Sequence, residues 1–425
     1  MRILFLTQYY PPETGAPQNR LSDLAARLKK AGHFVEVLTA LPSYPKGEIY
    51  EGYRRSFIKT EELAGIRVVR SWVYATKRKS FVPRILNYLS FAVFSIVVAL
   101  VACGNVDVVY VESPPLFLGF SGYLVSRIKR ARFVLNISDL WPESAVVLGM
   151  LRNRRLIGLA NWAELWLYRH AWMVTGQTEG IVDSIRERSP NTPTHLITNG
   201  VEPEFLEQVA LARTARARLK QQFGFGDDFI VAYAGVHGLA QGLDTLLESA
   251  ALVKHQKEIR FHFFGDGPEK IHLQKTAKEK GTENVAFHPP ISRSQIADLL
   301  ACIDVAIVPL KRDDLFKGAL PSKLFEALGA GVPVIAALGG EAEKLMERSQ
   351  GGIVVEPENP GQMSEAIVRL YADADLRNRL AERGPRFIRA HYNREEIAKN
   401  FETLISAKPV HVRSDAKLQE VTRYD

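Results

Sequence analysis

Short apolar runs alternate with amphipathic stretches through the first 200 residues. The stretch from Asn19 or Arg20 to Lys30 has apolar positions at helical spacing and ends before Gly32, so it is a predicted helix. Such alternation predicts a parallel sheet with helices on both faces. The predicted strands are Ile3–Thr7, His33–Thr39, Ile66–Trp72, Val106–Glu112, Phe133–Ile137, Trp172–Thr175 and His195–Thr198.

The same alternation restarts after a charged helix at about residues 206–223. The predicted strands are Phe229–Ala234, Arg260–Phe264, Val285–His288, Val305–Val308 and Val332–Ala337, and the helices between them are Gly242–Lys257, Lys270–Lys280, Ser294–Cys302 and one from Ser322. We therefore predict an α/β fold in which two Rossmann-like domains face each other across a cleft. The predicted domains are 1–202 and 203–388, followed by a helix at 389–407 that packs back on the N-terminal domain and a disordered tail at 408–425.

Ligands of parallel sheets bind beyond the carboxyl ends of the strands. In the first half, these positions correspond to the loops Gln8–Gln18, Glu112–Leu116 and Ser138–Ser144. We expect the functional residues of this half to lie there.

The stretch from Lys317 to Val334 predicts an anion site. A glycine-containing loop leads into a helix that Ser322 is expected to cap, and the free N–H groups of a helix start attract anions. Lys323 lies in the first turn, where a cation is unfavourable for the helix, which suggests a functional role. The inferred anion is a diphosphate, and Glu326, one turn later, could hold ribose hydroxyls. An ordinary surface helix with charged residues is the alternative.

Composition favours a globular protein of two or three domains, with 425 residues, 46% hydrophobic and 24% charged. Cys103 and Cys302 stand in apolar contexts, as buried thiols of a reducing compartment do, and no metal-binding spacing is present. The apolar start is too short for a signal peptide, so we expect a cytoplasmic location. The net charge of +8 allows an anionic membrane as partner. Nucleic acid is not expected, because no corresponding motif is found.

The segment Ile85–Cys103 contains no charged residue and is long enough to cross a bilayer. A membrane span is rejected, because strands on both sides of it must join one sheet. A buried crossover helix is one interpretation, and a helix whose N-terminal part lies on anionic lipid is the preferred one. That part combines Lys77, Arg78, Lys79 and Arg84 with Phe81, Val82, Ile85 and Tyr88.

A second possible membrane patch is Met150–Arg155 with three tryptophans, Trp162, Trp166 and Trp172. The alternative here is an ordinary helix that buries its tryptophans.

Six short motifs stand in order along the chain: Tyr9-Tyr10-Pro11-Pro12-Glu13-Thr14-Gly15, Asp139-Leu140-Trp141-Pro142-Glu143-Ser144, Asn199-Gly200-Val201, Tyr233-Ala234-Gly235, Gln241-Gly242-Leu243-Asp244 and Leu320-Pro321-Ser322-Lys323-Leu324-Phe325-Glu326. Together they resemble the retaining glycosyltransferases of the GT-B fold, from Arg2 to about Leu404. Within that family, the chain is similar to the O-antigen and capsule transferases that move sugars of the N-acetyl-fucosamine type.

The resemblance assigns roles at the second domain's site, where nucleotide sugars bind in this family. Glu326 matches the glutamate that holds the donor's ribose, whereas Gly318 stands where the family has a second glutamate, so loop backbone is expected to replace it. The family's diphosphate-binding cations after Gly235 are missing as well, which shifts that role toward Lys323. His237 is a further candidate, with a surface histidine as the alternative.

The first domain is implied to hold the acceptor. Gly15 matches a glycine whose backbone approaches the phosphates. Asp139 and Glu143 match sugar-contacting positions, although Asp139 could equally cap the following helix. The complete candidate set is Lys323, Asp139 and Gly318 for catalysis, and Gly15, Gly235, His237, Gln241, Gly265, Gly267, Ile291, Ala319, Leu320, Pro321, Ser322, Lys323 and Glu326 for the donor.

The resemblance implies transfer with retention from a UDP-sugar to a polyprenyl-diphosphate-linked saccharide, in O-antigen or capsule biosynthesis. The enzyme is expected on the inner face of the plasma membrane, without metal or cofactor; no Asp-x-Asp motif stands at the end of a predicted strand, and Asp313 and Asp314 lie in a loop. One alternative is a GT-B epimerase acting on a sugar nucleotide, and another is a non-enzymatic scaffold at the membrane. A dehydrogenase is disfavoured, because no glycine-rich dinucleotide motif follows the first strand.

Overall fold

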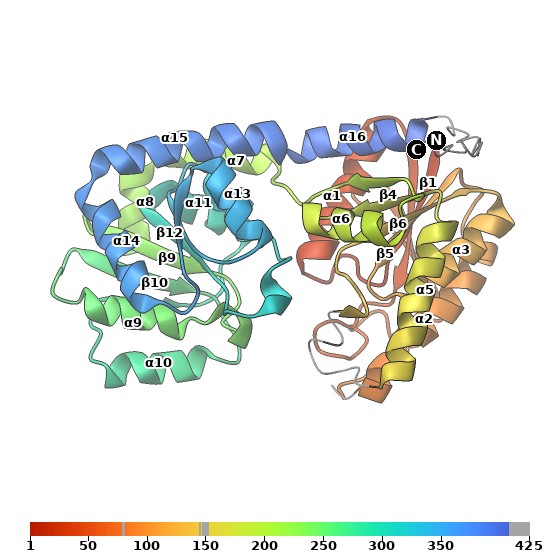
Figure 1. Cartoon of the computed structure of the whole chain (residues 1–425), viewed down its shortest axis with the longest axis horizontal. Helices are drawn as coiled ribbons and strands as arrows, with labels where there is room; N and C mark the ends of the chain where they lie inside the picture. Colours follow the sequence, from red (N-terminus) through yellow and green to blue (C-terminus); the bar gives the residue numbers. More distant parts are fainter. Residues whose placement is uncertain (79–80, 144–145, 147–152, 408–425) are drawn as a thin grey trace, which may run out of the picture.

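The computed structural model describes residues 1–78, 81–143, 146 and 153–407. Each half of the chain forms its own parallel sheet covered by helices on both faces (Figure 1). This is the predicted α/β architecture of two Rossmann-like domains, and the fold class is confirmed. The predicted tail, 408–425, lies outside the described residues, as do Lys79 and residues 147–152.

The first sheet has the order β3-β4-β2-β1-β5-β6-β7-β8. All neighbouring strands are parallel except the edge strand β3, which pairs antiparallel with β4. The apolar residues of β1 and β5 are fully buried, as expected for strands covered on both sides. Its strands are β1 (Arg2–Leu6), β2 (Phe34–Ala40), β3 (Ile58–Leu63), β4 (Ile66–Ser71), β5 (Val108–Ser113), β6 (Arg132–Ile137), β7 (Met173–Gly176) and β8 (Thr194–Leu196).

The second sheet has the order β11-β10-β9-β12-β13-β14 and is parallel throughout. The strand order reverses between β9 and β12, the point at which sheets of this type bind ligands. Its strands are β9 (Phe229–Ala234), β10 (Ile259–Phe264), β11 (Val285–His288), β12 (Val305–Pro309), β13 (Val334–Ala337) and β14 (Gly352–Val355).

Helices follow the strands in both domains. In the first they are α1 (Ala16–Lys30), α2 (Phe81–Ala102), α3 (Phe117–Lys129), α5 (Arg154–His170) and α6 (Glu179–Arg188). From the linker onward they are α7 (Pro203–Arg213), α8 (Arg216–Gln222), η1 (Leu239–Gln241), α9 (Asp244–Leu252), α10 (Lys270–Glu279), α11 (Arg293–Cys302), η2 (Asp314–Phe316), α12 (Ser322–Gly329), α13 (Glu341–Ser349), α14 (Pro360–Ala372), α15 (Ala374–His391) and α16 (Arg394–Ser406).

The last helix returns to the first domain, as predicted. α15 runs along the second domain and α16 continues across the top of the first (Figure 1). Phe401 is fully buried there, with its ring centroid 5.0 Å from that of Tyr110. Where the chain crosses between the domains in both directions, the Val201 N–H donates to the Tyr392 carbonyl at 2.9 Å, so the two crossings lie side by side.

Some predicted boundaries are wrong. α1 begins at Ala16 rather than at Asn19 or Arg20, because Pro17 is tolerated in a first helical turn. The end of the second domain holds two successive helices, α14 and α15, which are separated where the Asp373 side chain caps α15 by accepting from the Leu376 N–H. The region at about 206–223 likewise divides into α7 and α8, and the short strands β3 and β14 were not predicted.

Helix α2 is not the buried crossover helix of the alternative interpretation. Among the described helices it is the one that is long and apolar enough to cross a membrane, yet only 28% of its most apolar stretch is buried. The preferred interpretation was also too narrow, because exposed apolar side chains extend from Val82 at one end to Val101 at the other. β4 and β5, on either side of α2, lie in one sheet, as the rejection of a span required.

Candidate functional site

The site is organised by the start of α12, at the carboxyl edge of the second sheet. Ser322 is the first helical residue and not the cap: Pro321, in extended conformation, occupies the N-cap position. The prediction for Ser322 was therefore wrong. No side chain caps this helix among the described residues, so the N–H groups of its first turn are not engaged by a side-chain oxygen. An uncapped helix start is suited to an external anion.

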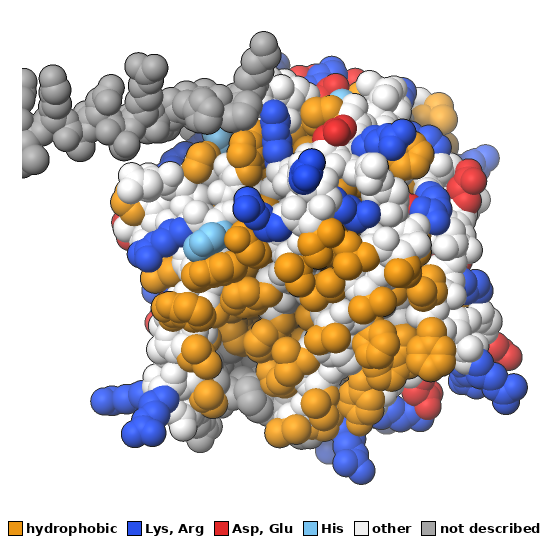
Figure 2. All heavy atoms as spheres, turned by 90° about the vertical axis from the view of Figure 1, so that its right-hand side faces the viewer, with side chains coloured by type: hydrophobic (Ala, Val, Ile, Leu, Met, Phe, Trp, Pro, Cys, Tyr) orange, Lys and Arg blue, Asp and Glu red, His pale blue; other side chains and the backbone are white. Residues whose placement is uncertain are grey.

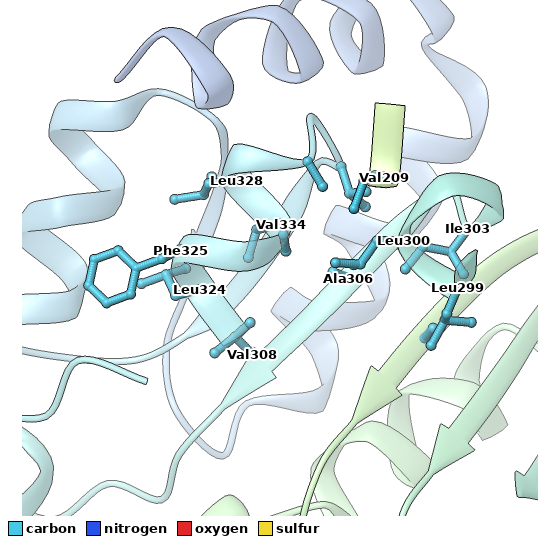
Figure 3. Packing of buried hydrophobic residues seen from close by; sticks show 14 of the residues in the cluster. Val209, Leu299, Leu300, Ile303, Ala306, Val308, Leu324, Phe325, Leu328 and Val334 are labelled. Atoms are coloured by element: carbon cyan, nitrogen blue, oxygen red, sulfur yellow. The ribbon is translucent and has the colours of Figure 1, made fainter. Parts of the chain in front are cut away.

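The apolar side of α12 fixes its position. Leu324, Phe325 and Leu328 are fully buried, and they pack in one cluster with Val308 of β12 and Val334 of β13 (Figure 3). Burying a side chain of this size contributes roughly 1.5–3 kcal/mol. The helix is thus anchored to the sheet, while Lys323 and Glu326 line a crevice together with Ala234 at the end of β9.

Lys323 points back at the end of β9. Its Nζ donates to the Tyr233 hydroxyl at 3.0 Å and lies 4.2 Å from the centre of that ring. The Tyr233 hydroxyl in turn donates to the Val236 carbonyl at 2.7 Å. Burial lowers the pKa of Lys323 to about 8, against the attraction of Glu326, because a desolvated ammonium is costly. A bound anion would relieve that cost, so the site is prepared for negative charge.

Three glycines allow the loops after β9 and β10 to approach each other closely. Gly235, Gly265 and Gly267 all have positive φ. A Cβ on Gly235 would lie 2.6 Å from the Lys323 amine, and one on Gly265 would lie 1.8 Å from the Gly235 carbonyl oxygen. A Cβ on Gly267 would lie 2.3 Å from the carbonyl oxygen of His237. These positions therefore require glycine, both for conformation and for space.

His237 is fully buried between these loops, so its interpretation as a surface histidine is wrong. The correction has a physical cause: its N–H donates to Asp266 and its carbonyl accepts from Glu269, which holds the residue under the second loop. Neither ring nitrogen has a hydrogen-bond partner among the described residues. Burial and the charges of Lys270 and Lys323 lower the pKa of His237. A buried imidazole without partners beside a lysine is a candidate ligand contact.

Glu326 belongs to a chain of charges that extends to the domain junction. Arg293, the first residue of α11, pairs with Glu326 and, at 2.7 Å, with Glu202 at the N-cap of α7. Arg394, the first residue of α16, also binds Glu202, at 2.5 Å, and donates to the Gly200 carbonyl at 3.0 Å. Burial raises the pKa of Glu326, and Arg293 opposes that rise. The expected ribose carboxylate is thus connected to both interdomain crossings.

The remaining donor candidates lie in several loops of the second domain. Gly318 is exposed, and the space where its Cβ would lie is open, whereas Ala319 is half-buried and its N–H donates to Phe316. Leu320 lines a crevice shared by the two domains, formed by residues such as Thr178 and Tyr392. Gln241 ends η1, close to Gly238, and Ile291 packs against the core two residues before Arg293. Of these positions, Ala319 and Leu320 directly precede α12 in the chain, and Ile291 packs against the cluster that contains Leu324 of α12.

In the first domain, Gly15 is the N-cap of α1 and has extended backbone. The neighbouring Glu13 is buried and accepts from the N–H groups of Ser43 and Tyr44, each at 2.8 Å, which fixes the loop after β1. Asp139 is exposed after β6. The helix that it was alternatively expected to cap includes residues outside the described ones.

Sequence reasoning missed a buried polar network beside these loops. Arg20 of α1 binds Glu112 at the end of β5 at 2.6 Å and reaches Ser138 after β6 at 3.2 Å. Asn136 donates to the same Glu112 at 2.8 Å. Arg20, Glu112 and Asn136 hold three loops at the carboxyl edge of the first sheet in fixed relation. The signal available in the sequence was the presence of Glu112 and Asn136 in the otherwise apolar strands β5 and β6.

Such a site can bind a phosphorylated, ribose-containing ligand. It offers uncapped helix N–H groups, one lysine, one imidazole and one carboxylate. Among the described residues, no group of three or more His, Cys, Asp or Glu could hold a metal ion.

The two-domain architecture is that of the GT-B proteins, as solved structures show. The structure of Anabaena Alr3699/HepE in complex with UDP covers 96% of this chain and all of that chain, with a TM-score of 0.71 and 18% identity. The structure of WaaG, a glycosyltransferase involved in lipopolysaccharide biosynthesis, covers 95% of this chain and all of that chain, with a TM-score of 0.67 and 15% identity. At these identities the likeness shows the fold.

The chain belongs to the group 1 glycosyltransferases. Residues 215–387 match the family model "Glycosyl transferases group 1", and residues 15–200 match the model "Glycosyl transferase 4-like domain". The glycosyl transferase WcaI of Escherichia coli (strain K12), whose name assigns it to colanic acid biosynthesis, is 29% identical over 84% of this chain and 89% of its own. The lipopolysaccharide core biosynthesis glycosyltransferase LpsE of Rhizobium meliloti (strain 1021) is 24% identical over 57% of this chain and 66% of its own.

Proposed function

We propose that this glycosyltransferase transfers a sugar from a UDP-sugar to a polyprenyl-diphosphate-linked saccharide, with retention, in the biosynthesis of a surface polysaccharide. The transferred sugar is of the N-acetyl-L-fucosamine type. The observation that supports the donor class is the pairing of Lys323 with Tyr233 at an uncapped helix start, one turn before Glu326. Structures of the same fold contain UDP and UDP-glucose, and relatives are named for colanic acid and lipopolysaccharide synthesis.

Each site residue has a role in this proposal. The diphosphate lies at the start of α12, where helix N–H groups, Lys323 and His237 surround it. Glu326 accepts the ribose hydroxyls, and the loop after β10, with Gly265 and Gly267, faces the nucleobase. The backbone at Gly318–Leu320 takes the place of the family's missing glutamate near the transferred sugar.

Catalysis depends on stabilising the charge of the departing UDP. As the glycosidic bond breaks, negative charge grows on the β-phosphate, and preorganised donors stabilise charge that develops in the transition state. Lys323 is already desolvated, so its attraction for that charge is stronger than in water. The departing phosphate oxygen takes the proton of the acceptor hydroxyl, and Asp139 and Gly15 approach the acceptor side. No metal or cofactor takes part.

The acceptor lies in a membrane, so the enzyme acts as a peripheral protein on the cytoplasmic face of the plasma membrane. Two charged contacts, Glu179 with Arg348 at 3.0 Å and Arg27 with Glu204 at 2.8 Å, join the two halves of the chain. Closure around the donor would exclude water and favour transfer over hydrolysis.

A screen of nucleotide sugars tests the donor class. UDP-sugars should raise the unfolding temperature of the protein, whereas ADP-sugars and GDP-sugars should not. Release of UDP should then depend on a polyprenyl-diphosphate saccharide. Stabilisation by GDP-sugars alone would contradict the donor assignment.

The same assay separates the epimerase alternative, which the family matches do not favour. An epimerase would convert the donor sugar without an acceptor, and a scaffold would bind no nucleotide. UDP release without an acceptor lipid, or conversion of one UDP-sugar into another, would replace the transferase proposal.

A further inference from the structure

One side of the first domain carries a continuous apolar surface (Figure 2). Seven described apolar side chains of its three helices are more than half exposed: Val82, Val93, Val97 and Val101 of α2, Ile128 of α3, and Leu159 and Trp162 of α5. Soluble proteins rarely expose large contiguous apolar patches without a partner. We refer to this surface as the α2–α3–α5 face.

The three helices pack side by side into one rigid unit. The Ser121 hydroxyl of α3 donates to the Ala92 carbonyl of α2 at 2.7 Å. Trp166 of α5 stacks on Phe120 of α3, with ring centroids 5.4 Å apart. Trp166 and Trp172 are thus half-buried, and Trp162 is the exposed one of the three tryptophans suggested for a membrane patch. The exposed residues therefore form a preformed surface and not separate side chains.

The solvent-exposed charged side chains of these helices are all basic. Arg84 on α2, Arg127 on α3 and Arg169 on α5 are exposed, as are Arg154 and Arg155 at the start of α5. The acidic residue in these helices, Glu164, is buried and paired with Arg188. Figure 2 shows lysine and arginine side chains around the apolar area. An apolar area with a basic border matches an anionic lipid surface.

We propose that the α2–α3–α5 face inserts into one leaflet of an anionic membrane, with α2 lying in the plane of the membrane along its whole length. The proposal rests on the proposed function in one respect, that the acceptor is a membrane lipid. A second copy of this chain is the other possible occupant. A two-fold pairing through this face would bring two basic borders against each other, and like charges across an interface are unfavourable.

The orientation would bring the membrane next to the acceptor side of the cleft. Gln8, which follows β1, donates through Nε2 to the Asn87 side-chain oxygen of α2 at 2.6 Å. Asn87 also donates to the Tyr74 carbonyl at 2.7 Å. The N-terminal part of α2 is thereby joined to the loop that ends at Gly15, so a lipid-linked saccharide would reach the cleft without leaving the leaflet.

Binding to vesicles tests the proposal. Vesicles of phosphatidylcholine with phosphatidylglycerol should bind the protein, and those of phosphatidylcholine alone should bind it at least tenfold more weakly. The triple variant Val93→Glu, Val97→Glu and Val101→Glu should reduce binding to the anionic vesicles by roughly tenfold or more. Leu211→Glu with Leu252→Glu and Ile271→Glu is the matched control, because these residues are exposed apolar side chains on helices of the second half of the chain. The control should bind as the unchanged protein does.

The depth of insertion gives an independent measurement. Brominated lipids should quench the fluorescence of the bound protein, and Trp162→Phe should remove most of that quenching, although the chain has five tryptophans. Equal vesicle binding by the triple variant and its control would overturn the proposal. So would a dimer in solution that the triple variant dissociates, with no binding to vesicles.

Two further readouts separate this proposal from the proposed function. Unchanged UDP affinity and unfolding temperature in the triple variant would show that the fold is intact. Transfer to a short-chain, water-soluble acceptor should be unchanged in the triple variant, whereas transfer to acceptor in vesicles should fall. Vesicle binding without any transfer to either acceptor would contradict the proposed function but would support membrane insertion of the α2–α3–α5 face.

Discussion

The guanidinium of Arg293 pairs with the carboxylate of Glu326, and Arg293 simultaneously holds Glu202 at the domain junction at 2.7 Å. Without Arg293, the carboxylate of Glu326 would lie in its crevice without an ion-pair partner. Burial alone raises the pKa of Glu326. In the proposed site, Arg293 therefore acts as a positioning residue, which orients Glu326 toward the ribose and favours its ionised form.

Replacing Arg293 should make UDP binding dependent on pH. In Arg293→Met, the pKa of Glu326 should rise further, because the attraction of Arg293 is lost while burial and the repulsion from Glu202 remain. UDP affinity should then fall about tenfold at pH 6, the equivalent of a shift of one pKa unit, and recover toward pH 8. Calorimetric titration with UDP at both pH values measures it.

Two variants control this prediction. Arg293→Lys keeps the charge and should restore most of the affinity at pH 6. Arg260→Met removes an arginine of similar exposure, paired with Asp228 at 3.2 Å, and should leave UDP binding unchanged at both pH values. A pH-independent loss in Arg293→Met would show a purely structural role.

Glu326→Ala should weaken UDP binding by about 1–3 kcal/mol, the cost of losing a hydrogen bond to a charged group. The loss should depend on the ribose hydroxyls, since these are the proposed partners. With 2′,3′-dideoxy-UDP, the variant and the unchanged protein should bind equally. A loss of the same size with both nucleotides would contradict the ribose assignment.

Lys323→Ala should lower turnover at saturating donor and acceptor by on the order of a hundredfold, as when one preorganised charge-stabilising donor is removed. UDP affinity should fall less, because the charge on the phosphate grows as the bond breaks. Lys344→Ala, which removes an exposed lysine paired with Glu341, should leave turnover unchanged. Normal turnover with only a raised donor KM would mean that Lys323 binds substrate and does not stabilise the transition state.

Binding of UDP should take up a proton near pH 9. The pKa of Lys323 is lowered to about 8 from an ordinary 10.5. In the protein without ligand, the Lys323 amine is therefore mostly uncharged at pH 9. The diphosphate should raise this pKa again, and UDP affinity should fall up to tenfold per pH unit above pH 8. Calorimetry in buffers of different ionisation enthalpy counts the proton, and Lys323→Met should abolish the uptake. No uptake in the unchanged protein would contradict the contact between Lys323 and the diphosphate.

Activity should be independent of divalent cations, because Lys323 and the start of α12 supply the positive charge at the leaving group. Turnover should be the same with EDTA and with added magnesium or manganese. Loss of activity in EDTA that magnesium restores would require a metal in the mechanism.

The sequence pattern predicted the two sheets and the place of Lys323 and Glu326, because both depend on local features: strand–helix alternation and charges in the first turns of a helix. The partners of these residues could not be predicted in this way. Tyr233 and Arg293 meet α12 only after β9 and α11 pack beside it. The burial of His237 likewise depends on the loop after β10, which covers it.

The exposed surface of α2 could not be predicted from local sequence either. Its sequence is apolar on almost every side, so periodicity could not tell which side would be covered. Packing against α3 and the sheet covers Phe91 and Ala99 and leaves Val93 and Val97 exposed. The charges near Arg84 correctly drew attention to the helix but marked only one of its ends.

Helix α16 gives the first domain an unusual dependence on the order of synthesis. Phe401 and Ile405 fill the core beside Phe5 and Tyr110, although they are translated almost 300 residues after Tyr110. During translation, the apolar site that α16 will fill therefore stays exposed on the first domain until the whole second domain has been synthesised. A ribosome-bound fragment ending at residue 202 should remain open to proteases and chaperones, and supplying residues 389–407 as a separate peptide should close it.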